Sequence, residues 1–212
     1  MKALTSLISL AAVAGAITVA LGGCASSASS PRFYTLAAPT AAAAAAVPSG
    51  AAPLWIEVGP LAVPERLARP QMVVRTAGVN AQVDVLEDSR WASSFENEMR
   101  DALSSGIASQ LGALDGTRGG RPAAAPVVRI SVQVRRFDAV DGSRVDASLG
   151  WSARHGEQSR ALVCQLNLSE PVGGPGIDAV AQSAQRLTAN ASAAIARGVT
   201  ALQSNPDAAC PV

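Results

Sequence analysis

The stretch Val128-Arg129-Ile130-Ser131-Val132-Gln133-Val134-Arg135 alternates apolar and polar side chains without interruption. Successive side chains of a β-strand point to opposite sides, so this alternation predicts a strand with one buried face and one polar face. It is the clearest strand signal in the chain. We take it as the centre of the fold, because the segments that follow it repeat the same pattern.

Two further alternating segments follow this strand after short turns. They span residues 144–153 and 162–168, and the turn signals are Asp141-Gly142 and residues 155–159. Loops of this length join the strands of antiparallel hairpins, so the three segments predict a three-stranded meander. The apolar side chains share one face of the meander, which leaves the other face polar.

The polar face of the predicted meander is rich in arginine. We interpret either this face or the edge of the domain near the tether as the candidate surface for binding a partner protein. An ordinary solvated surface explains the same side chains at least equally well. The residues concerned are Arg129, Gln133, Arg135, Arg144 and Arg154.

Two other segments carry an apolar residue at about every fourth position, which predicts amphipathic helices. They span residues 91–114 and 177–202, and the second begins after a Gly-rich linker. Candidate N-terminal caps of the first helix are Asp88, Ser89, and Ser93 paired with Glu96.

Shorter strand signals precede the first helix at residues 54–58, 72–75 and 82–86. Helices with a single apolar face can both pack on one side of a sheet. The predicted fold class is therefore α+β, a two-layer sandwich with a mostly antiparallel sheet and two amphipathic helices packed on one face.

The N-terminus has the layout of a bacterial export signal: Lys2, then an apolar run to Leu21, then small residues. The sequence Leu21-Gly22-Gly23-Cys24 resembles the lipobox of bacterial lipoproteins. In that family the cysteine thiol receives a diacylglycerol, the signal is cut before the cysteine, and the new N-terminal amine is acylated. The alternatives are an ordinary secretory signal and a retained membrane helix. We predict lipidation at Cys24, and the lack of Asp directly after it resembles lipoproteins sorted to the outer membrane.

These signals predict four segments. Residues 1–23 form the signal peptide, residues 24–53 a lipid anchor with a tether rich in Ser, Ala and Pro, residues 54–205 the folded domain, and residues 206–212 a tail. Within the tether, residues 32–36 are aromatic and β-prone, and they can add an edge strand to the domain.

Charge and chemistry exclude several functional classes. The chain has 17 basic and 16 acidic residues, and removal of Lys2 with the leader leaves 16 of each, which argues against nucleic-acid binding. His155 is the only histidine, so neither a metal site nor a nucleophile–base pair is predicted. The Gly-rich residues 173–176 lack the lysine of a phosphate-binding loop. We predict no enzymatic activity and no cofactor.

Cys164 and Cys210 allow two interpretations. The periplasm is oxidising, so they can pair, and closing a loop of this length would stabilise the fold by about 4 kcal/mol. The favoured interpretation is an unpaired Cys164, because it lies on the inward face of a predicted strand, where a free cysteine behaves as a small apolar residue.

Three motifs carry a resemblance to a known family: residues 31–36, residues 56–67 and Trp91-Ala-Ser-Ser-Phe95 with the helix after it. Over about residues 31–203 the chain resembles the ABC-type transport auxiliary lipoproteins of the PqiC/YmbA type. The resemblance implies a lipoprotein on the periplasmic face of the outer membrane, which supports membrane integrity by accompanying an MCE-domain periplasm-spanning protein and its inner-membrane component in lipid transport.

Other functions stay open at this stage. One is a periplasmic lipoprotein that itself binds a lipid or another hydrophobic ligand, and another is a component of a different outer-membrane assembly machine. The sequence leaves open whether the chain forms a homo-oligomer, and it does not identify the transported lipid.

Overall fold

The computed structural model describes residues 30–37, 53–76, 82–156 and 160–211. The predicted signal peptide, Cys24 and most of the predicted tether lie outside these residues, so what we expect of them stays a prediction. None of the helices in the described part of the chain is both long and apolar enough to cross a bilayer. The folded domain begins at Pro31.

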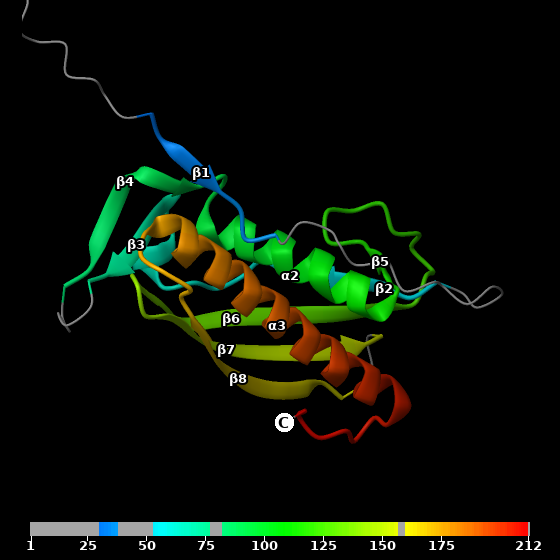
Figure 1. Ribbon diagram of the computed structural model, residues 1–212. Coiled ribbons are helices and arrows are strands. Elements are labelled where there is room, and N and C mark those ends of the chain that lie inside the picture. Colours follow the sequence, from blue (N-terminus) through cyan, green and yellow to red (C-terminus); the bar gives the residue numbers. More distant parts are fainter. Residues whose placement is uncertain (1–29, 38–52, 77–81, 157–159, 212) are drawn as a thin grey trace, which may run out of the picture. The chain divides into compact units, whose positions relative to one another are not determined.

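The predicted meander is formed by β6 (Val127–Val140), β7 (Arg144–His155) and β8 (Leu162–Pro171), and it makes up one side of the sheet, with β8 at the edge. β7 lies between β6 and β8 and is antiparallel to both (Figure 1). The register places Ser131 opposite Ser152 and Ser152 opposite Val163. A bulge interrupts the β6–β7 ladder between Val134 and Arg136, so Arg135 is the extra residue of β6.

Five shorter strands extend the sheet beyond β6. Both β2 (Trp55–Val58) and β3 (Gln71–Arg75) pair with the free edge of β6 in parallel, β2 near its start and β3 near its end. β4 (Asp84–Trp91) is antiparallel to β3, while β1 (Arg32–Tyr34) and β5 (Leu114–Asp115) add parallel pairs to β4 and β2. The α+β fold is confirmed; the long ladders are antiparallel as predicted, and the short parallel pairs make the sheet mixed.

The first helix, α2 (Phe95–Leu111), starts later than predicted. Ser94 caps it, because the Ser94 hydroxyl accepts a hydrogen bond from the backbone N–H of Asn97 at 3.4 Å. The predicted start at Trp91 is wrong, because Trp91 continues β4 and pairs with Tyr34 of β1. The helix ends at Gly112, which has the left-handed conformation (φ 59°) that glycine favours at this position.

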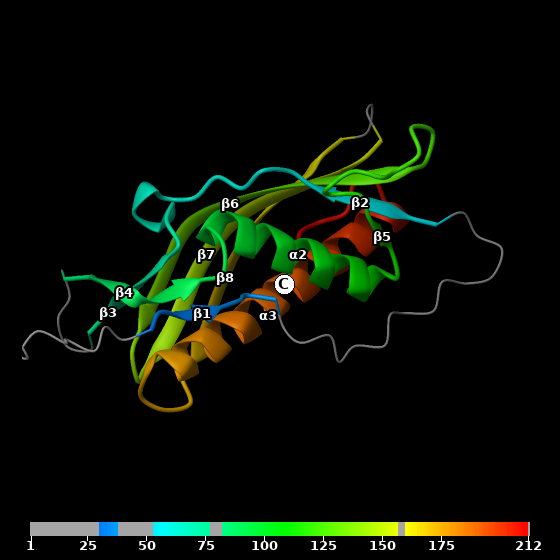
Figure 2. The ribbon, with the colours of Figure 1, turned by 90° about the horizontal axis from the view of Figure 1, so that it is seen from above.

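The second helix, α3 (Ile177–Ser204), confirms the predicted apolar stripe. It lies beside α2, and both helices cover the same face of the sheet (Figure 2). Small residues bring the two helices close together. A Cβ atom on Gly106 of α2 would lie 2.5 Å from the Ser192 hydroxyl oxygen of α3, so glycine is required at this crossing.

The folded domain begins earlier than the boundary predicted at residue 54. β1 is part of the sheet, and the Leu36 side chain is only 1% exposed within the hydrophobic core. The physical reason is that β1 forms backbone hydrogen bonds with β4, and that burial of the Leu36 side chain adds apolar contacts to the core. Residues 31–37 therefore belong to the domain and not to the tether.

Candidate functional site

The candidate site is the outer face of the meander, which we define as the side of β6, β7 and β8 opposite the two helices. The alternation of each strand places its polar side chains on this face. All five residues of the predicted partner face are exposed in the structure: Arg129, Gln133, Arg135, Arg144 and Arg154.

Two adjoining hollows cross the outer face, and we call them together the trough. The larger holds about 580 Å³ and has Gln133, Arg135 and Gln165 among its lining residues. The smaller holds about 400 Å³ and is lined by residues that include Arg129 and Arg154. Both include Ser131 and Ser152, so the hollows meet there. The trough exists because small side chains occupy the middle of the sheet between longer ones.

Arg135 lies over the floor of the trough at Gly150. A Cβ atom on Gly150 would be 3.2 Å from Nη2 and 3.3 Å from Nε of Arg135. The missing side chain of Gly150 therefore lets the guanidinium lie close to the sheet. The bulge at Arg135 and the glycine across from Gln133 together fix the position of this cation.

Arg144 differs from the other residues of the predicted face. It lies at the opposite end of β7, where its Nε is 2.8 Å from Oδ2 of Asp146. Burial alone would raise the pKa of Asp146, but hydrogen bonds from Ser169 and Arg144 outweigh it and hold this pKa below its ordinary value. The charge of Arg144 is thus compensated locally, and the structure brings together only the other four residues.

The two ends of the trough carry positive charge. Arg129 and Arg154 are directly opposite each other on β6 and β7. Arg129 shares Glu57 with Arg121, since its Nε is 3.5 Å from Glu57 Oε2 while Arg121 Nε is 2.7 Å from Oε1. Among the residues that the structure describes, neither Arg135 nor Arg154 has an ion-pair partner.

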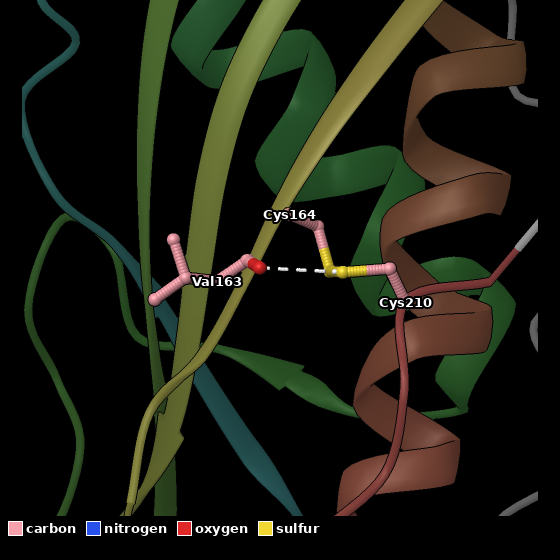
Figure 3. The surroundings of a disulfide bond; sticks show 3 residues. All are labelled: Val163, Cys164 and Cys210. Carbon is pink, nitrogen blue, oxygen red and sulfur yellow. Dashed lines mark hydrogen bonds between the residues drawn. A yellow bond between two sulfur atoms is a disulfide. The ribbon is translucent and has the colours of Figure 1, made fainter.

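A disulfide between Cys164 and Cys210 forms the rim of the trough at β8 (Figure 3). The Cα atoms lie 5.7 Å apart, and Cys210 Sγ is 3.2 Å from the carbonyl oxygen of Val163. Cys164 is buried on the inward face, as predicted, but the favoured interpretation of an unpaired thiol differs from the structure. The reason is that α3 returns the chain to the start of β8, which brings Cys210 beside Cys164.

Residues 31–37 are held against both helices by polar contacts. The Tyr34 hydroxyl donates a hydrogen bond to Asp178 of α3 at 2.6 Å. The backbone N–H of Leu36 donates to Glu98 of α2 at 3.1 Å, and Gln185 of α3 donates to the carbonyl oxygen of Thr35 at 2.8 Å. The segment that follows the predicted lipid anchor is therefore fixed to the domain.

Tyr34 provides a test of this attachment, because it is the only tyrosine of the chain. Burial, followed by the hydrogen bond to Asp178, raises the pKa of Tyr34 above 10.0. We expect the tyrosinate absorbance of the folded protein to titrate above pH 10, and Asp178→Asn to lower that midpoint. The stabilisation linked to this shift is complete below pH 10 and is lost as the pH rises through the folded-state pKa.

The control for this titration is Asp207→Asn, which removes an exposed carboxylate that pairs with Arg160 instead of Tyr34. It should leave the midpoint unchanged. A midpoint at or below 10 in the folded wild-type protein, with folding checked by circular dichroism, would contradict the attachment of Tyr34 to α3.

The described residues offer little for catalysis. No group of three His, Cys, Asp or Glu side chains gathers as metal ligands within this part of the chain. His155 is the exposed last residue of β7. The apolar cavity between the sheet and the helices, lined by residues that include Trp91 and Phe95, holds only about 10 Å³.

Comparison with known proteins places this geometry in a family. The model of the ABC-type transport auxiliary lipoprotein component matches residues 34–196. No curated protein matches the chain. A crystal structure of an uncharacterized protein is similar with a TM-score of 0.61 at 22% identity, covering 81% of this chain and 99% of the other. Protein XCC0632 from Xanthomonas campestris, of the DUF330 family, is similar with a TM-score of 0.57 at 15% identity, covering 83% and 98%. Since the family model spans more than half of the sequence, the chain belongs to the ABC-type transport auxiliary lipoprotein family.

Proposed function

We propose that this protein is a non-enzymatic lipoprotein of the outer membrane, facing the periplasm, and an accessory subunit of an envelope lipid-transport complex. Its partners are an MCE-domain protein that spans the periplasm and the inner-membrane component of the same system. The observation that carries the proposal is the family match over residues 34–196, which assigns an accessory role in transport. The lipobox-like sequence that ends at Cys24 supports the membrane anchor.

The attachment of β1 limits how far the domain can stand from its anchor. Residues 25–30 separate Cys24 from Pro31. The Cα atoms of Cys24 and Pro31 are therefore at most about 25 Å apart, even in a fully extended chain. A lipidated Cys24 would therefore keep the domain close to the bilayer. Residues 38–52 do not lengthen this tether, because they lie after the attached segment and not before it.

Among the described residues, the size of the apolar cavity beside Trp91 and Phe95 argues against a lipid held between the sheet and the helices. Sites for small molecules usually have volumes of about 300–1,000 Å³. The apolar cavity between sheet and helices holds about 10 Å³, which is too little for an acyl chain. The proposal therefore assigns lipid handling to the partners.

Replacing Cys24 by serine tests the proposal. We expect the wild-type protein to incorporate labelled palmitate, to fractionate with the outer membrane and to restore the detergent resistance of a strain that lacks the gene. Cys24→Ser should lose all three properties, because three acyl chains supply the anchoring energy at about 0.8 kcal/mol per buried CH₂ group.

The matched control is Cys210→Ser, which makes the same chemical change outside the lipobox and should still incorporate palmitate. Wild-type protein isolated in mild detergent after cross-linking should carry the MCE-domain protein with it. An unlabelled wild-type protein would refute the anchor. Co-isolation with a lipopolysaccharide-assembly or secretion machine instead would favour the alternative of a different outer-membrane assembly.

A further inference from the structure

We infer that the trough binds an extended, acidic polypeptide segment of a partner protein, with carboxylates at Arg135 and Arg154. This inference rests on the proposed function, because it gives the docking site for a subunit of the transport complex. It narrows the predicted partner face to the residues that the structure gathers around the two hollows.

The charge of the trough selects an anionic occupant. Arg135 and Arg154 have no ion-pair partner among the described residues, while the nearby Glu57 is already shared by two arginines. A guanidinium binds a carboxylate through two parallel hydrogen bonds, which gives the pair geometric specificity. At the far end of the same face Arg144 pairs with Asp146, so the charge of Arg144 is compensated locally.

The length of the trough fits a stretched peptide. The guanidinium of Arg135 lies over Gly150, which pairs with Gln133. Gln133 and Arg129 lie four positions apart on β6, which is about 13 Å at the rise of a strand. Arg154 stands opposite Arg129, so a segment of about five residues can reach from one charged end to the other. Across the trough, neighbouring strands are about 4.8 Å apart, which leaves room for one extended chain over β6, β7 and β8.

The floor of the trough favours a peptide over a lipid. Ser131, Ser152, Gln133 and Gln165 offer hydroxyl and amide groups along its length. The large apolar side chain exposed there is Val163, at 72% exposure, and one such side chain cannot shelter acyl chains. A polypeptide backbone, by contrast, carries a donor and an acceptor at nearly every residue and can bond to this floor.

The test uses the full-length protein in detergent and a fluorescein-labelled heptapeptide that has glutamate at its second and sixth positions and serine or threonine at the others. We expect fluorescence anisotropy to show saturable binding that weakens with added salt. Arg135→Glu and Arg154→Glu should each weaken binding by about tenfold, because each reversal replaces one ion pair by a repulsion. The same peptide with glutamine in place of glutamate should not bind.

The matched control is Arg197→Glu, which makes the same charge reversal at an exposed position of α3, on the helix layer. It should bind the peptide as the wild type does, and circular dichroism should show that all variants are folded. If Arg197→Glu weakened peptide binding as much as the trough variants do, the inference would be overturned, because the net charge of the protein would then explain the binding.

Two further outcomes would also overturn it. One is displacement of the peptide by glycerophosphoglycerol at equal concentration, which would assign the trough to a lipid headgroup. The other is self-association in sedimentation velocity that Arg135→Glu and Arg154→Glu abolish, which would assign it to a second copy. If the double variant Arg135→Glu/Arg154→Glu restores detergent resistance in the strain lacking the gene, the trough is not the docking site, but the proposed function stands. Failure of the Cys24→Ser experiment would instead contradict the proposed function itself.

Discussion

Replacing Gly198 by valine is expected to lower the free energy of unfolding by about 3 kcal/mol, since overpacking a dense core forces side chains and backbone to move. A Cβ atom on Gly198 would lie 2.3 Å from Cη2 and 3.0 Å from Cζ2 of Trp151, far inside van der Waals contact. Trp151 is only 4% exposed and belongs to the hydrophobic core. The close approach of α3 to β7 therefore depends on the missing side chain.

The measurement is urea-induced unfolding followed by circular dichroism. The matched control is Thr200→Val, which places the same residue at an exposed position of the same helix and should change stability by less than about 0.5 kcal/mol. A double-mutant cycle isolates the contact. Trp151→Ala should be destabilising alone, but adding Gly198→Val to it should cost little, because the indole is gone. Strictly additive effects would contradict the proposed contact.

Periodicity in the sequence was sufficient for the long elements. The alternation of residues 128–135, 144–153 and 162–168 predicted the meander, and the apolar stripe of residues 177–202 predicted α3. These patterns succeed because each element is long and has a buried face and an exposed face. No periodic pattern in the sequence indicates the contact of Gly198 with Trp151, because this contact depends on how α3 crosses the sheet.

Short and context-dependent features were harder to predict. The edge strand expected at residues 32–36 is confirmed by β1, but β5 is too short to show a period. The parallel partners of both strands are distant in the sequence, so the pairing left no signal. The start of α2 was misplaced because Trp91 fits the helical spacing but pairs in β4 instead. In the candidate site, alternation placed the arginines on one face, but only the bulge at Arg135 and the pairing of Arg144 with Asp146 show which of them share the trough.

Loss of the disulfide is the second large expected effect. The bond joins residues separated by 46 positions, and a cross-link over a loop of this length stabilises the folded state by about 4 kcal/mol, chiefly by restricting the unfolded chain. We expect the wild-type protein to unfold at a lower urea concentration in the presence of a reductant. Cys210→Ser should unfold there as well, whether or not the reductant is present.

The control that separates the two interpretations of these cysteines is thiol labelling. In the oxidised wild-type protein, unfolded in urea, a maleimide should label neither Cys164 nor Cys210. In unfolded Cys210→Ser, it should label one thiol, that of Cys164. Labelling of both cysteines in wild-type protein isolated from an oxidising compartment would instead support the unpaired, buried Cys164 that the sequence favoured.

The disulfide variant also tests whether the rim of the trough depends on the cross-link. Cys210 lines the larger hollow and lies against the Val163 carbonyl, so without the bond the tail loses its covalent hold on the edge of β8. In the absence of urea, where both proteins are fully folded, Cys210→Ser should then bind the acidic heptapeptide more weakly than the wild type does. A contrary outcome is that Cys210→Ser is less stable and yet binds the peptide as the wild type does. The cross-link would then stabilise the fold without shaping the trough, because one substitution would have changed stability and left peptide binding intact.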